Sequence, residues 1–146
     1  MPVDPIPDDL PRVMPYLTVQ GVGGLLEFIA DVFDGRVLEN MKSPDGKVMH
    51  AEVAVGDSVI MMGEARPDDG PMPAMLYIYV SDADSIYRRA IASGATSITE
   101  PGDQFYGDRN AGVKDSWGNQ WWIASRIEKL SPEQLMKRAA ELHGGS

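Results

Sequence analysis

His50 and Glu52 are the two residues of this sequence whose types and spacing could do chemistry together. They lie two residues apart in a run, Lys47 to Val55, that predicts a β-strand, so both side chains project from one face. An imidazole beside a carboxylate can contact polar groups of a ligand, transfer protons or take part in a metal site. The same pair could also form a hydrogen bond at the sheet edge with no function.

Aromatic and methionine side chains gather on one face of three other predicted strands, 14–19, 75–80 and 119–125. Such a surface suits a planar or apolar ligand, and the tyrosine hydroxyls would need partners if they are buried. A packed core gives the same pattern, and both interpretations remain open. The residues are Met14, Tyr16, Met75, Tyr77, Tyr79 and Trp122.

The segment 102–109 offers further candidate contacts. Its first part, Gly102 to Gly107, is expected to form a flap that presents Phe105 and Tyr106. Arg109 could bind a ligand carboxylate through two parallel hydrogen bonds. An ion pair of Arg109 with Asp108 or Asp115 is the favoured interpretation. The second histidine, His143, is expected to face solvent.

The elements that must position these residues occur twice. Tyr16 and Tyr77 are 61 residues apart, Gly35 and Gly94 are 59 apart, and Gly56 and Gly118 are 62 apart. A repeat of this length indicates one supersecondary unit used twice. The predicted fold is α+β: two βαβββ modules whose curved mixed sheet surrounds a cleft, with a C-terminal helix.

Local signals set the expected boundaries. In the first module, an amphipathic helix begins near Val22 and ends at Gly35, and strands follow over 36–41, 47–55 and 58–62. In the second, Ser81 or Asp82 caps a helix that ends at Gly94, and a hairpin joins 108–114 to 119–125. We expect a flexible lead over 1–13, a domain over 14–126 (modules 14–63 and 74–126) and a helical tail over 127–146. Ser131, Pro132 and Gln134 form a capping box at the start of that tail.

Composition limits the function. The 146 residues carry a formal net charge of -9 and no cysteine. An acidic chain argues against nucleic acid as a partner, and the missing thiols exclude disulfides and thiolate chemistry. We expect a cytoplasmic protein with no membrane-spanning segment.

Several motifs resemble the vicinal-oxygen-chelate superfamily, which includes glyoxalase I, extradiol dioxygenases and bleomycin resistance proteins, and most of all its PhnB-like branch. The similarity covers about 14–138 and departs at Ser116, where the superfamily often has proline. The motifs are EFIADVFDGRV (27–37), VMHAEVAVGDSVIMM (48–62), YGDR (106–109), DSWGNQWWIAS (115–125) and LSPEQLMKR (130–138).

The resemblance implies four metal-ligand positions, which fall in this chain on Met14, on Ile60 or Met61, on Met75 and on Trp122. Thioether, aliphatic and indole side chains do not bind a divalent ion in the usual way. We therefore expect no metal ligand and no cofactor. The His-Ala-Glu at 50–52 resembles the PhnB-like sequences and supports a functional role for His50 and Glu52.

Two hypotheses follow. The first is a metal-free protein of the bleomycin-resistance type that sequesters a planar aromatic or amphipathic compound, with no catalytic residue. The alternative is a glyoxalase-like lyase, isomerase or dioxygenase with an atypical metal site at His50 and Glu52. The expected partners are a small organic ligand and a second copy of the chain in a homodimer. The tail helix could grip that copy or pack on its own domain. The expected ligand-binding residues are Tyr16, His50, Glu52, Tyr77, Tyr79, Phe105, Tyr106, Arg109 and Trp122.

Overall fold

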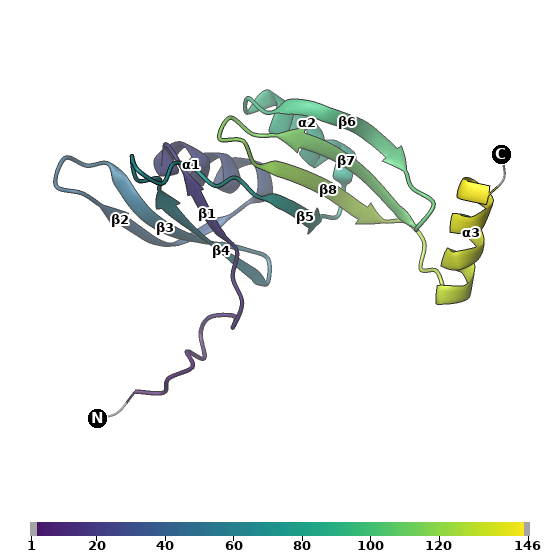
Figure 1. Cartoon of the computed structure of the whole chain (residues 1–146), viewed down its shortest axis with the longest axis horizontal. Coiled ribbons are helices and arrows are strands. Elements are labelled where there is room, and N and C mark those ends of the chain that lie inside the picture. The colour runs from purple at the N-terminus through teal and green to yellow at the C-terminus, as the bar shows by residue number, and fades with distance from the viewer. Residues whose placement is uncertain (1–2, 145–146) are drawn as a thin grey trace. The chain divides into compact units, whose positions relative to one another are not determined.

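A computed structural model describes residues 3–144 of the chain (Figure 1). The chain divides between Ala74 and Met75 into two compact units. Each unit has a four-stranded mixed sheet and a helix that packs on it, and α3 follows the second sheet. This confirms the predicted α+β class, the two βαβββ modules and the C-terminal helix. Across the described part of the chain, no helix combines the length and the apolar character needed to span a membrane.

The first unit has the strand order β1-β4-β3-β2, with β1 parallel to β4 and the other neighbours antiparallel. Its elements are β1 (Tyr16–Val19), α1 (Val22–Phe33), β2 (Arg36–Lys42), β3 (Val48–Val55) and β4 (Ser58–Glu64). The first strand is shorter than predicted, because regular pairing begins at Tyr16. One further bond, from the Met61 N–H to the Pro15 carbonyl at 2.9 Å, precedes it. Met14 therefore lies outside the strand.

The apolar stripe of α1 is buried as predicted, and it covers the sheet face that carries Leu17, Val19 and Val53. The start of α1 is held by a residue far along the chain. Both carboxylate oxygens of Glu64, the last residue of β4, accept from the N–H of Gly21 at 3.1 Å, and one accepts from Val22 at 3.2 Å. A carboxylate suits this place because the first N–H groups of a helix have no partner within it.

The end of α1 differs from the expectation. The left-handed residue is Asp34, with φ of 53°, and Gly35 is not left-handed. Gly35 is needed for space instead, because a Cβ there would lie 2.8 Å from Cγ2 of Val53. Aspartate tolerates the left-handed region better than most residues do.

The second unit repeats the topology in the order β5-β8-β7-β6. Its elements are β5 (Met75–Tyr79), α2 (Ala83–Ala92), β6 (Thr96–Asp103), β7 (Asp108–Lys114), β8 (Gln120–Arg126) and α3 (Pro132–Gly144). Because β6 includes Gly102 and Asp103, the expected flap is only a tight turn over 104–107. Two backbone bonds close this turn, from Gln104 to Asp108 at 2.7 Å and from Gly107 to Gln104 at 3.1 Å.

The predicted caps of the second unit are confirmed. Asp82 accepts from the Ser85 N–H at 3.2 Å, and Gly94 ends α2 with φ of 105°. At the start of α3, the Ser131 hydroxyl accepts from Gln134 at 3.2 Å, and the Gln134 side chain accepts from Ser131 at 2.9 Å. No residue of α3 is buried. Arg138 connects α3 to the rest of the second unit, because it donates two 2.8 Å hydrogen bonds to Glu128.

Candidate functional site

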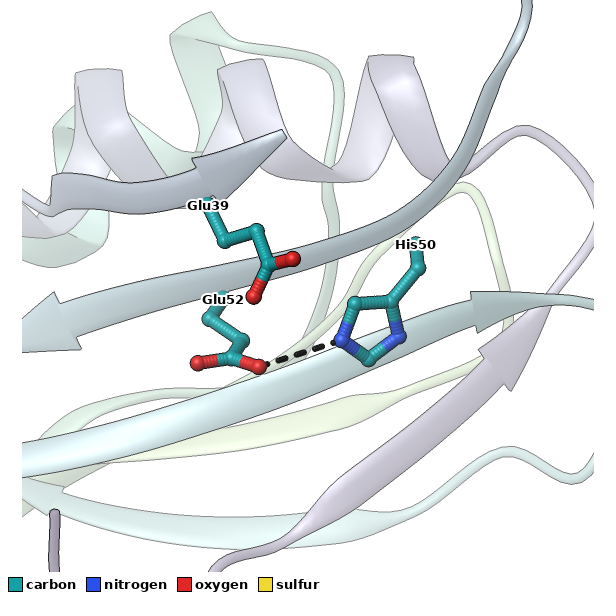
Figure 2. A group of neighbouring side chains, drawn as sticks. All are labelled: Glu39, His50 and Glu52. Carbon is teal, nitrogen blue, oxygen red and sulfur yellow. Dashed lines mark hydrogen bonds and ion pairs between the residues drawn. The ribbon is translucent and has the colours of Figure 1, made fainter. Parts of the chain in front are cut away.

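A polar group occupies the open face of the first sheet, the face turned away from α1. Glu39 on β2 lies directly opposite Glu52 on β3, and His50 lies two residues before Glu52 (Figure 2). The His50 Nε2 and the Glu52 Oε2 are 3.2 Å apart. One donor atom from each of the three residues lies within 4.8 Å of the others. Figure 2 shows the three side chains converging from two adjacent strands.

Tyr16 connects this group to the edge of the sheet. Its hydroxyl oxygen lies 3.3 Å from the Nδ1 of His50, and the two rings are 5.9 Å apart between centroids. The phenol passes over Gly63 of β4, where a Cβ would lie 3.0 Å from two ring carbons. Both nitrogens of His50 are therefore engaged, one by Tyr16 and the other by Glu52.

A cavity of about 740 Å³ opens beside Tyr16. It is lined by the ends of β1 and β4 and by the connecting segment 66–73. Arg66 brings an exposed guanidinium to it, while Met72 and two prolines bring apolar surface. The cavity can therefore receive a compound that combines apolar and polar or anionic groups.

The second unit holds a network of tyrosines on the equivalent face of its sheet. Tyr77 and Tyr79 donate their hydroxyls to the same oxygen of Asp108, at 2.6 and 2.8 Å. The side-chain amide of Asn110 donates to Tyr77 at 3.2 Å and to Tyr106 at 2.6 Å. Asp108 and Asn110 are 5% and 3% exposed, whereas the tyrosines keep 45% (Tyr77) and 55% (Tyr79) of their surface in solvent. The rings are thus exposed and their hydroxyls are fixed.

This network holds the tyrosines in their neutral form. Burial is the larger cause that raises the pKa of Tyr77 well above its usual value, and the hydrogen bond to Asp108 is the second. For Tyr79 the hydrogen bond to Asp108 is the larger cause of the raised pKa, and burial is the second. A carboxylate that accepts from a phenol stabilises the protonated phenol, because the phenolate would repel it.

Trp122 lies beside the tyrosine network, since it is the register partner of Tyr77 across β5 and β8. It is half-buried, and its ring lies over Gly112, where a Cβ would approach it to 2.8 Å. Its neighbour Trp121 is 1% exposed on the other face and donates its Nε1–H to Asp115 at 2.8 Å. The two tryptophans therefore face opposite sides of the sheet, as the strand pattern predicts.

Arg109 does not join the tyrosine face. It alternates with Asp108 and Asn110 along β7, so its side chain projects to the other side. It bonds both oxygens of Asp84, at 2.7 and 2.9 Å, and Asp103 at 2.9 Å. The expected pairing with Asp108 or Asp115 is wrong. Because of this ion pair, Arg109 lowers the pKa of Asp84.

Phe105 lies in the turn, near the last helix. Its ring centroid is 5.2 Å from that of Tyr106 and 6.2 Å from that of His143. Its carbonyl accepts from Arg138 at 3.3 Å. His143 is exposed, as expected. Phe105 thus connects the turn to α3, while the hydroxyl of Tyr106 belongs to the Asn110 network.

The four positions where the superfamily resemblance places metal ligands do not fit a metal ion. The structure decides between two of them: Ile60 is 5% exposed and faces the helix, while Met61 lies on the open face between Tyr16 and Glu52. The side chains on these positions are thus Met14, Met61, Met75 and Trp122. They offer thioethers and an indole, where such an ion needs imidazole or carboxylate.

Sequence reasoning missed three polar residues of these groups: Glu39, Asp108 as the tyrosine acceptor, and Asn110. A hairpin around the turn 43–46 would suggest that β2 pairs with β3. However, the pairing shifts register between Val37 and Glu39 and again between Met41 and Lys42. These irregularities cannot be read from residue spacing, so nothing in the sequence places Glu39 opposite Glu52.

The comparisons with known proteins agree with this architecture. Residues 10–123 match the model of the Glyoxalase/Bleomycin resistance protein/Dioxygenase superfamily. The chain belongs to this superfamily. An uncharacterized protein of Mycobacterium bovis is 26% identical over 136 residues, which cover 86% of this chain and 90% of that protein.

Solved structures show the same fold. TioX from Micromonospora sp. ML1 aligns with a TM-score of 0.68 at 21% identity, over 80% of this chain and 99% of that one. A Bacillus cereus structure described as a putative 3-demethylubiquinone-9 3-methyltransferase, PhnB protein, aligns with a TM-score of 0.63 at 15% identity. That alignment covers 79% of this chain and 99% of the other. At these identities the likeness concerns the fold alone.

Proposed function

We propose that this protein binds and sequesters a planar aromatic or amphipathic compound, as a bleomycin-resistance-type member of its superfamily. The observation that carries the proposal is the aromatic face of the second unit, which comprises Tyr77, Tyr79, Tyr106 and Trp122. Binding there would not use a metal ion at the superfamily's usual positions.

The aromatic face is preorganised for binding. Large aromatic surfaces that stand in solvent gain free energy when a flat ligand stacks on them. Asp108 and Asn110 already hold three of the hydroxyls, so little side-chain freedom remains to be lost on binding. A core packing role does not account for rings that are 45% and 55% exposed.

In the first unit, taken by itself, Tyr16, His50 and Glu52 are candidate polar contacts for a ligand in the cavity that Tyr16 lines. Tyr16 lines the 740 Å³ cavity and is hydrogen-bonded to His50. A ligand with polar groups beside an apolar body suits this combination. We leave Arg109 out of the ligand-binding set, because its guanidinium is already bonded to Asp84 and Asp103.

The test is a titration of the protein with a panel of planar aromatic compounds, followed by tryptophan fluorescence. We expect saturable binding, and we expect Tyr77→Ala with Tyr79→Ala to weaken it at least tenfold. The matched control is Tyr87→Ala, because Tyr87 lies on α2 and bonds Ser97 at 2.8 Å, away from the aromatic face. Equal weakening by the control, or no saturable binding in the panel, would contradict the proposal.

A second candidate function is a glyoxalase-like lyase, isomerase or dioxygenase with an atypical metal site at His50 and Glu52. The observation in its favour is Glu39, which adds a third possible ligand. The two functions differ in what happens to the bound compound. A sequestering protein returns its ligand unchanged after denaturation, whereas an enzyme converts it in a metal-dependent way.

We further propose that the chain is a cytoplasmic homodimer of the PhnB-like branch. The His-Ala-Glu at 50–52 and the fold likeness to the Bacillus cereus protein support the branch. Support for the dimer comes from α3, none of whose residues is buried, and from the outer strand β2, all of whose residues are exposed. An unpaired edge and an unburied amphipathic helix are surfaces that a second copy can cover.

A further inference from the structure

We propose that Glu39, His50 and Glu52 bind a divalent first-row transition-metal ion, and that Tyr16 is the positioning residue for His50. Among the described residues, this is the one group of three histidine, aspartate or glutamate side chains whose donor atoms converge within 4.8 Å. Donors around such an ion lie about 2.1 Å from it. A small rotation of the exposed Glu39 side chain would complete the site.

The charges of the group favour a cation. Glu39 and Glu52 are direct cross-strand partners, and like charges in that relationship destabilise a sheet. Within residues 3–144, no lysine or arginine forms an ion pair with either carboxylate, and the neighbouring Lys47 bonds Glu64 instead. The Glu52 side chain is only 12% exposed, so solvent screens it little. A bound cation would offset this repulsion.

The imidazole is already oriented as a ligand. Its Nδ1 faces the Tyr16 hydroxyl at 3.3 Å, and its Nε2 faces the Glu52 carboxylate at 3.2 Å. In metal sites, the ring nitrogen that does not bind the metal is usually held by such a hydrogen bond.

The donor set indicates the class of ion. Mg²⁺ and Ca²⁺ prefer sites made of oxygen alone, while one imidazole nitrogen with carboxylate oxygens suits Zn²⁺, Mn²⁺, Fe²⁺, Co²⁺ or Ni²⁺. Three protein ligands on an open sheet face would leave coordination positions free. The site is also distinct from the four positions of the superfamily resemblance. Its residues lie on β2 and β3, on the same face as Met61.

The test uses the full chain, freed of metal, and two probes. Zn²⁺ is titrated by calorimetry, and Co²⁺ is followed by its visible absorption, which reports bound nitrogen and oxygen ligands without any activity. We expect one ion per chain. Glu39→Gln, His50→Gln and Glu52→Gln should each weaken binding at least tenfold. Tyr16→Phe, which removes only the hydroxyl, should weaken it less.

The controls are Glu27→Gln on the exposed side of α1 and His143→Gln, the other histidine; both should bind as the unchanged chain does. Thermal melts show whether each variant is folded, so that lost binding is not mistaken for an unfolded chain. Glu39→Gln removes a like-charge contact, so without metal its Tm should equal or exceed that of the unchanged chain. At the same Zn²⁺ concentration, the Tm of the unchanged chain should rise, and that of Glu39→Gln should rise less.

The proposal is overturned if the chain binds no Zn²⁺ or Co²⁺, or if Glu39→Gln binds as tightly as the unchanged chain. Loss of binding in His143→Gln with retention in His50→Gln would overturn it too. The inference does not rest on the proposed sequestration. Failure of the metal titration would leave the aromatic face untouched, and failure of the aromatic panel would leave the ion site standing.

Discussion

The phenol of Tyr16 reaches across β4 to the imidazole of His50, with 3.3 Å between its hydroxyl oxygen and Nδ1. The same relationship recurs in the second unit, where Asn110 donates to Tyr77 at 3.2 Å. In each unit the tyrosine lies on the first strand and its partner on the strand two places away in the sheet. The repeat thus preserves the geometry and changes the chemistry, because an imidazole in the first unit stands where the second unit has an amide.

The first prediction concerns Gly63. In Gly63→Ala the added methyl group would meet the phenol, so Tyr16 should move and its bond to His50 should break. Because Tyr16 is 51% exposed and its ring can move toward solvent, we expect the free energy of unfolding to fall by only about 1 kcal/mol, the low end for overpacked sites. Denaturant unfolding measures this change. Gly102→Ala is the control, because nothing lies closer than 4.0 Å to a Cβ there and its unfolding should be unaffected. Equal stability of the two variants would contradict the predicted contact.

The second prediction separates Trp121 from Trp122. Trp121→Ala removes a side chain that is 1% exposed, together with one of the buried donors to Asp115, so the fold should lose roughly 3–5 kcal/mol. Trp122→Ala should instead weaken the binding of aromatic ligands several-fold and have a modest effect on stability. The lost stacking costs about 1 kcal/mol of binding free energy beyond the loss that comes from the buried area. Thermal melts beside ligand titrations measure both. Lost binding in a Trp121→Ala variant that melts normally would argue against this assignment of faces.

The third prediction concerns the pH dependence set by Asp108. The pKa of Tyr77 and of Tyr79 is raised above the ordinary value of 10.0. Because both pKa values are higher in the folded than in the unfolded chain, the two tyrosines contribute stability that is fully present below about pH 10. This contribution is lost as the pH rises through the folded-state pKa values. In Asp108→Asn we expect tyrosinate absorbance to appear at lower pH and the alkaline loss of stability to shrink.

At neutral pH, Asp108→Asn should cost on the order of 1–3 kcal/mol, because two phenols would compete for a weaker acceptor. Denaturant unfolding and an absorbance titration provide the two readouts. Asp57→Asn, in the exposed turn after β3, is the control and should change neither. An unchanged tyrosine titration in Asp108→Asn would show that the carboxylate does not set these pKa values.

The fourth prediction concerns assembly through α3. One face of this helix carries Leu135, Met136, Ala139 and Leu142, and Met136 and Leu142 are 74% and 60% exposed. Light scattering at micromolar concentration should give about twice the chain mass of 15.9 kDa. Leu142→Glu should shift the protein toward monomer, whereas Lys137→Glu, on the opposite face of α3, should not. A monomeric unchanged chain would refute the dimer.

Local patterns of the sequence determine a large part of this protein. The stripe from Val22 to Phe33 defines α1, because a helix buries every third or fourth residue whatever lies beneath it. Side chains alternate across a strand, so Trp121 and Trp122 must face opposite sides. The caps at Asp82 and Ser131 are equally local, since each side chain bonds a backbone group three residues on.

Tertiary structure alone decides the chemistry of the two faces. Glu39 meets Glu52 only because β2 pairs with β3 through two register shifts, which spacing along the chain does not reveal. Arg109 bonds Asp84 of α2 and not its neighbour Asp108, because the strand turns the two side chains to opposite faces. Asp108 is left to Tyr77, 31 residues earlier, whose hydroxyl reaches it from β5. Periodicity fixes which way a side chain points, and the partner it meets there depends on strand register and on residues distant in the sequence.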